Sequence, residues 1–167
     1  SKVNLMVGHI YLYNNGIKQI PIPIGPATLY VKLLNAGGSP SNSTRDVIWA
    51  GLPHACSLAL HFFPGMPERV EVIRDKDRVK VILFYWNGSE AYLDVGDNTG
   101  VKLRGVELRE SDRRFLFDGT SPNELQIIRG GYRTSVSSVS KVEPIAPEPL
   151  LEECKAFLTY KGVDPMG

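Results

Sequence analysis

The stretch at residues 69–95 reads RVEVIRDKDRVKVILFYWNGSEAYLDV, and it decides the expected fold. Apolar runs rich in Val, Ile, Phe and Tyr are separated by the turn-forming segments Asp75-Lys76-Asp77 and Asn87-Gly88. An Asn-Gly pair between alternating hydrophobic runs is the strongest short-range signal for a β-hairpin. This stretch therefore predicts three consecutive antiparallel strands, at residues 69–74, 78–86 and 89–95.

The same pattern continues on both sides of this stretch. Further strands are expected at residues 3–13, 17–24, 28–34, 47–49, 55–63, 101–109, 113–117, 125–129 and 132–139. Asn14-Asn15-Gly16 would turn the first of these into the second, and Pro21 and Pro23 make that second strand an edge strand or an extended arm. Roughly ten short strands with closely spaced turns are typical of an antiparallel β-sandwich or a jelly-roll-like barrel.

The C-terminal part has a different pattern. Pro144, Pro147 and Pro149 precede a segment whose apolar residues lie near one helical face, which predicts one C-terminal helix at about residues 149–161. The expected organisation is a single domain. Residues 1–34 form N-terminal strands or an arm, 35–46 an exposed loop, 47–143 the main antiparallel β domain, and 144–167 a Pro-rich linker with the helix.

Composition excludes several classes of protein. The chain has 167 residues, with 19 Lys and Arg against 18 Asp and Glu, so its net charge of +1 does not favour nucleic-acid binding. No apolar run approaches the roughly 20 residues of a membrane span. The sequence contains neither the Gly-x-Gly-x-x-Gly turn of dinucleotide-binding folds nor the phosphate-binding loop of nucleoside triphosphatases, and no cofactor is expected.

One group of reactive side chains suggests a hydrolase as an alternative function. His54 would be the base for a Cys56 or Ser57 nucleophile, with Asp46 orienting the imidazole. If residues 55–63 formed a strand, however, His54 and Cys56 would share a face with their β-carbons about 6–7 Å apart, which is too far for a relaxed pair. The other interpretation is a core cysteine beside a loop histidine.

A calcium-assisted, lectin-like sugar binder is a further alternative. Asp94, Asp97 and Asn98 crowd one turn and offer oxygen ligands, but their spacing is not that of an EF-hand. The chain has no Cys-x-x-Cys pair and no histidine cluster, so no metal site is assigned. Cys56 and Cys154 are either a disulfide or two free thiols. Asn42 and Asn87 lie in N-glycosylation patterns, which matter only in a secretory pathway.

The leading hypothesis is a non-enzymatic recognition or assembly module. It would be a globular domain of a larger surface structure, such as a capsid projection, a fibre tip or an extracellular binding domain, and it would bind a protein or glycan surface within a larger assembly or oligomer. An extracellular or virion-surface location is accordingly favoured over the cytoplasm. The expected ligand-binding residues are Tyr85, Trp86, Asn87, Arg113 and Arg114, from an aromatic hairpin tip and a basic stretch.

Overall fold

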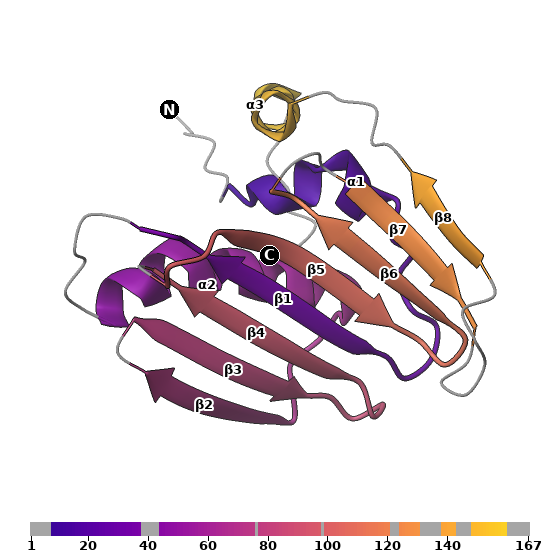
Figure 1. Ribbon diagram of the computed structural model, residues 1–167, viewed down its shortest axis with the longest axis horizontal. Coiled ribbons are helices and arrows are strands. Elements are labelled where there is room, and N and C mark those ends of the chain that lie inside the picture. The colour runs from indigo at the N-terminus through magenta and orange to yellow at the C-terminus, as the bar shows by residue number, and fades with distance from the viewer. Residues whose placement is uncertain are drawn as a thin grey trace.

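The protein folds around one mixed β-sheet (Figure 1). The computed structural model describes residues 8–37, 44–75, 77–97, 99–120, 124–130, 138–142 and 148–159. The eight strands are β1 (Thr28–Leu34), β2 (Arg69–Asp75), β3 (Arg78–Phe84), β4 (Glu90–Gly96), β5 (Leu103–Arg109), β6 (Arg113–Asp118), β7 (Glu124–Arg129) and β8 (Ser138–Val142). Their order across the sheet is β2-β3-β4-β1-β5-β6-β7-β8.

The expectation of an antiparallel sandwich or jelly-roll barrel is wrong. β1 pairs in parallel with β4, with Thr28 opposite Glu90 and Leu34 opposite Gly96, and it pairs antiparallel with β5 on its other side. The chain leaves β1, crosses one face of the sheet as a helix, forms β2 and β3 at the edge, and returns as β4. The sheet therefore combines parallel and antiparallel strands in one layer, with helices over one face.

The crossover helix is α2 (Thr44–Phe62), and it occupies the residues expected as strands at 47–49 and 55–63. Ala55, Leu58, Ala59 and Phe62 follow the i, i+3, i+4, i+7 spacing of one helical face, and each is at most 1% exposed. They pack against buried residues of β1, β3 and β4, and this interface forms the main core. Pro53 lies inside the helix, where the sequence suggested a loop.

The described N-terminal segment, residues 8–27, contains two short helical turns and neither of the strands expected at residues 3–13 and 17–24. A 3-10 turn, η1 (Ile10–Tyr13), leads into the short helix α1 (Asn15–Lys18), so the hairpin expected at Asn14-Asn15-Gly16 is absent from this described part. The side chain of Asn14 instead caps α1 by accepting a 2.8 Å hydrogen bond from the backbone N–H of Gly16. A β-carbon on Gly16 would lie 2.5 Å from the ring of Phe117, so this close approach requires glycine. Residues 1–7 lie outside the described part.

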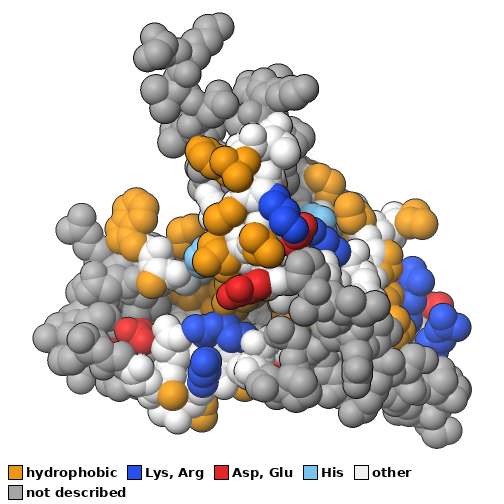
Figure 2. Space-filling model, turned by 90° about the horizontal axis from the view of Figure 1, so that it is seen from above, with side chains coloured by type: hydrophobic (Ala, Val, Ile, Leu, Met, Phe, Trp, Pro, Cys, Tyr) orange, Lys and Arg blue, Asp and Glu red, His pale blue; other side chains and the backbone are white. Residues whose placement is uncertain are grey.

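The C-terminal helix α3 (Pro149–Thr159) is present where the sequence predicts it. Its large apolar side chains do not pack on the sheet: Leu150, Leu151, Phe157 and Leu158 are 42–82% exposed. Figure 2 looks onto the side of the molecule that carries α3 and shows hydrophobic side chains at the surface there. Both cysteines are free thiols, Cys154 being exposed on α3 and Cys56 partly buried on α2. No helix among the described residues is long and apolar enough to cross a membrane.

Candidate functional site

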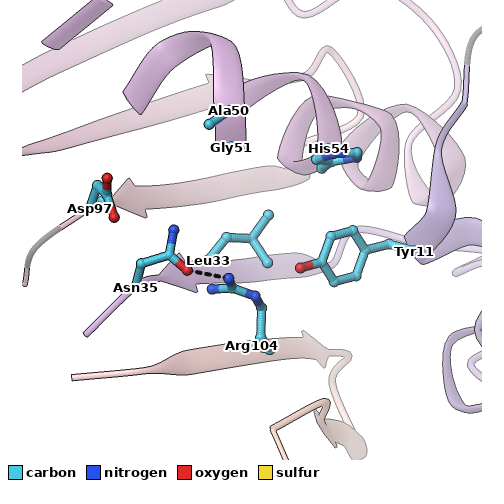
Figure 3. Close-up of a pocket in the computed structure, with 9 residues that line it drawn as sticks. Tyr11, Leu33, Asn35, Ala50, Gly51, His54, Asp97 and Arg104 are labelled. Carbon is cyan, nitrogen blue, oxygen red and sulfur yellow. Dashed lines mark hydrogen bonds between the residues drawn. The ribbon is translucent and has the colours of Figure 1, made fainter. Parts of the chain in front are cut away.

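A small polar pocket lies beyond the carboxyl ends of the two parallel strands (Figure 3). Its volume is about 50 Å³, which admits only one end of a substrate. Side chains from the segment before β1, from α2 and from β5 point toward the same space (Figure 3). The lining residues are Tyr11, Leu33, Asn35, Ala50, Gly51, His54, Gly96, Asp97 and Arg104.

Parallel pairing explains why residues distant in sequence meet at this place. Asn35 directly follows β1 and Asp97 directly follows β4, and because the two strands run in the same direction, both residues lie at one edge of the sheet. The backbone N–H of Asn35 donates a 3.0 Å hydrogen bond to the carbonyl of Gly96, which continues the strand pairing into the pocket. Ligands of open α/β sheets bind outside the carboxyl ends of the strands, so this is the edge at which a ligand site is expected.

Hydrogen bonds hold the side chain of Arg104 near the start of β5. Its Nη1 donates hydrogen bonds to the carbonyls of Leu34 at 2.8 Å and Leu103 at 3.1 Å, and its Nη2 donates to the side-chain oxygen of Asn35. These contacts join the end of β1 to the start of β5. They also hold a positive charge against the pocket, where it can stabilise negative charge on a bound group.

His54 is the imidazole of this pocket. Burial lowers its pKa below the ordinary value of 6.5, the charges of His9 and Arg104 lower it further, and Glu153 opposes them. The ring is therefore neutral at neutral pH, and a neutral imidazole can accept a proton. The ring of Tyr11 packs edge-on against it, with 5.5 Å between ring centroids.

Tyr11 contributes a hydroxyl to the same pocket. Burial raises its pKa above the ordinary value of 10.0, and Arg104 offsets part of this increase. The phenol therefore remains protonated at neutral pH and can donate a hydrogen bond. A neutral base, a hydroxyl donor and a fixed guanidinium together suit proton exchange with a polar group whose negative charge needs support.

Of the suggested hydrolase residues whose side chains the structure describes, His54, Cys56 and Ser57, only His54 lines the pocket. Cys56 follows it by two helical positions, so the two side chains leave α2 about 200° apart around its axis. The hydroxyl of Ser57 donates a 2.8 Å hydrogen bond to the backbone carbonyl of His54 and not to its ring. Asp46 precedes His54 by eight positions, about 12 Å along the helix. Burial also raises the pKa of Cys56, which disfavours its thiolate.

The aromatic residues suggested for ligand binding lie at the β3–β4 turn, in different environments. Tyr85 is 8% exposed and packs against Phe63, whereas Trp86 is 82% exposed. Asn87 shapes the turn by accepting a 3.0 Å hydrogen bond from the backbone N–H of Ser89. None of the three lines the pocket beside His54.

Three of the charged residues suggested for ligand or calcium binding, Arg113, Arg114 and Asp94, are engaged in ion pairs, whereas Asp97 lines the pocket and Asn98 lies outside the described residues. Arg114 binds the carboxylate of Glu107 with its Nη2 at 2.6 Å, and Arg113 pairs with Glu110. Arg78 donates two hydrogen bonds to the carboxylate of Asp94, which removes that group as a calcium ligand. Within the described residues, no group of three His, Cys, Asp or Glu side chains could hold a metal ion.

The sequence did not identify Tyr11, Asn35 or Arg104 as site residues, and it suggested Asp97 only as an oxygen ligand of a calcium turn. A signal was present for two of them, because Asn35 directly follows the strand predicted at residues 28–34 and Asp97 lies two residues after the strand predicted at 89–95. That signal points to a shared site only if the two strands are parallel neighbours, and the hairpin pattern favoured antiparallel neighbours instead. Arg104 lies in the same arginine-rich part of the sequence as Arg113 and Arg114, but no neighbour in the sequence distinguishes it.

The chain was compared with known proteins. No protein-family model matches it, and no curated protein does. Among solved structures, it is similar to the UDP-N-acetylglucosamine 3-dehydrogenase from Acidithiobacillus ferrooxidans, with a TM-score of 0.76 and 21% identity over 92% of this chain and 51% of that chain. A dehydrogenase from Clostridium difficile matches with a TM-score of 0.71 and 17% identity, over 93% of this chain and 53% of that one.

A third similar structure adds a bound cofactor. A 3-ketoreductase from Actinomadura kijaniata, solved with TDP-benzene and NADP, matches with a TM-score of 0.65 and 14% identity over 89% of this chain and 50% of that chain. This fold therefore occurs in NAD(P)-dependent oxidoreductases, and this chain spans about half of their length. The expectation of a non-enzymatic capsid, fibre or glycan-binding module is wrong, because the structures that share the fold are those of dehydrogenases and reductases.

Proposed function

We propose that this chain is the substrate-side part of a nicotinamide-dependent oxidoreductase that interconverts a hydroxyl group and a carbonyl group. The observation that carries the proposal is the neutral imidazole of His54 in a polar pocket at the carboxyl edge of the parallel strands, in a fold that dehydrogenases share. Oxidation of a hydroxyl group requires a base that takes its proton. His54 would have this role.

Two further residues support the same chemistry. The protonated hydroxyl of Tyr11 can donate a hydrogen bond to the substrate oxygen. Arg104, held by the carbonyl of Leu34 and the side chain of Asn35, places a positive charge where that oxygen becomes more negative. A substrate oxygen located between these groups would be positioned and polarised before its proton moves.

The residues of this chain do not fit a dinucleotide. The sequence lacks the Gly-x-Gly-x-x-Gly turn, and a pocket of about 50 Å³ cannot enclose such a ligand. A second parallel strand pair is also absent from the described sheet, whereas a dinucleotide-binding fold is built from several. The nicotinamide cofactor would therefore be held by residues other than those of this chain, opposite the pocket.

The test is to titrate histidine-labelled protein with UDP-N-acetylglucosamine, the compound named for the Acidithiobacillus ferrooxidans enzyme, and to follow the imidazole resonances by NMR. The resonance of His54 should move. The resonance of His61, on the same helix but outside the pocket, should not. UDP and N-acetylglucosamine, each added alone, show which end of the compound is bound.

The remaining control is NADH added without substrate, which should leave both imidazoles unchanged. If NADH alone moves the resonance of His54, this chain binds the cofactor and its assignment to the substrate side is wrong. If none of these compounds moves the resonance of His54, the pocket is not a site for this class of substrate.

A further inference from the structure

Three buried polar atoms without a partner among the described residues lie on three segments that pack around η1. They are Nδ1 of His9, Nδ1 of His54 and Oε1 of Glu153, and no group in the described part of the chain hydrogen-bonds to any of them. His9 directly precedes η1, His54 is on α2, and Glu153 is on α3. Leaving a buried polar group unpaired is unfavourable, so three such atoms on segments that pack together require an explanation.

The position of Glu153 is set by a glycine. A β-carbon on Gly8 would lie 2.8 Å from Oε1 of Glu153, so the carboxylate rests directly against the backbone beside His9. α3 has no fully buried residue, and its large apolar side chains are exposed. The helix nevertheless packs against η1 and places a carboxylate oxygen in a buried position. A helix that served only to fill space would bury its leucines and expose its acids.

We propose that Glu153 is a positioning residue for His54: together with His9, its carboxylate holds the Nδ1 side of the His54 ring through one bridging water molecule. The hydrogen bond at one ring nitrogen decides which tautomer is present and how the ring is oriented. The other ring nitrogen is then the one that exchanges a proton. This inference rests on the proposed role of His54 as the base of the pocket.

The charges around His54 determine the direction in which its pKa should change when Glu153 or His9 is replaced. Four charged or titratable groups face the ring. They are His9, directly before η1; Tyr11, in η1; Glu153, on α3; and Arg104, on β5. Burial, His9 and Arg104 lower the pKa of His54, and Glu153 raises it. Loss of the carboxylate should therefore lower the pKa of His54 further, and loss of the His9 imidazole should raise it.

The experiment is a pH titration of the labelled imidazoles in substrate-free protein, with nitrogen chemical shifts reporting the tautomer. In Glu153→Gln, the pKa of His54 should fall and its preferred tautomer should change. His9→Asn should shift the pKa of His54 in the opposite direction. Gly8→Ala retains the carboxylate but displaces it, and should shift the pKa of His54 in the same direction as Glu153→Gln.

The matched control is Glu152→Gln, which removes the neighbouring acid on the same helix. Glu152 pairs with Lys155 and is not among the groups that influence His54, so His54 should titrate as in the wild type. His61 is the internal reference in every variant. The proposal is overturned if His54 titrates identically in wild type, Glu153→Gln and Gly8→Ala. It is also overturned if Glu152→Gln has the same effect as Glu153→Gln.

These outcomes are separate from a failure of the proposed function. The titration reads the His54 ring without substrate, whereas the proposed function is tested by the response of that ring to UDP-N-acetylglucosamine. A shifted pKa in Glu153→Gln without any response to the compound would retain the positioning contact and remove the substrate assignment. If the His54 resonance responds to the compound but the pKa of His54 is unchanged in Glu153→Gln and Gly8→Ala, the substrate assignment is retained and the positioning contact is removed.

Discussion

The two longest helices of the molecule are attached to it in opposite ways. α2 buries a continuous face, in which Leu58 is fully buried and Phe62 is 1% exposed. α3 buries no residue fully, and its Leu158 is 82% exposed. α2 packs against β1, β3 and β4, whereas α3 touches mainly η1. One helix is part of the core, and the other lies on the surface beside the pocket.

This difference suggests that α2 stabilises the fold, whereas α3 places a residue of the site. Burial of apolar area supplies most of the free energy of folding, so α2 should contribute to global stability and α3 should contribute little. Elements with few buried apolar contacts open locally, at a lower free energy than the core. α3 can therefore place Glu153 against Gly8 without being required for the fold, and the comparison predicts which substitutions unfold the protein.

The largest expected effect comes from the same substitution made once in each helix. Leu58→Ala in α2 removes a fully buried side chain and should lower the free energy of unfolding by about 2–5 kcal/mol. Leu158→Ala in α3 changes an exposed side chain and should stay within about 0.5 kcal/mol of wild type. Denaturant unfolding of the two variants measures both values. Equal losses would show that α3 is packed as tightly as α2, and the comparison would fail.

The strands of the sheet were predictable, and the helix that crosses them was not. Six of the predicted strands between residues 69 and 129 correspond to β2 to β7, because local turns such as Asn87-Gly88 define them. α2 was missed because Pro53 and its β-branched and aromatic neighbours suggest a loop and strands. The helical spacing of Ala55, Leu58, Ala59 and Phe62 was present in the sequence but is short and competes with those signals.

The pocket was only partly predictable for a related physical reason. Hairpin signals report pairing between strands that are neighbours in sequence, but β1 and β4 pair across a separation of 62 residues, from Thr28 to Glu90. Asn35 and Asp97 meet only through that pairing. His54 was singled out, as the base of a hydrolase, because Cys56 and Ser57 lie beside it in the sequence, whereas Glu153 is on α3, almost one hundred residues later.

A second, smaller effect should distinguish the helices by pH. α2 carries His61, whose pKa burial lowers below the ordinary value of 6.5, and α3 carries no histidine. A depressed pKa in the folded state means that the unfolded state binds more protons as the pH falls. Stability is therefore unaffected by His61 above pH 6.5, and it is lost as the pH decreases from that value through the lower pKa of the folded state.

The measurement is the pH dependence of the unfolding free energy in wild type and His61→Asn. The variant should lose less stability than wild type on acidification through this range, because one depressed imidazole has been removed. His54 retains part of the effect, since burial lowers its pKa as well. If His61→Asn and wild type lose stability in parallel, the imidazole of His61 is not protected by the packing of α2 and the contrast between the helices is weaker than proposed.

The smallest expected effect concerns the ion pair of α3. Nζ of Lys155 lies 2.8 Å from Oε1 of Glu152, and this hydrogen bond lowers the pKa of the Glu152 carboxyl. Solvent screens such exposed pairs, and ordering two long side chains offsets the attraction. Glu152→Gln should therefore leave the unfolding transition unchanged within error, measured beside Leu58→Ala. A loss comparable to that of Leu58→Ala would mean that α3 is coupled to global unfolding. It could then no longer be regarded as a surface helix that positions one carboxylate.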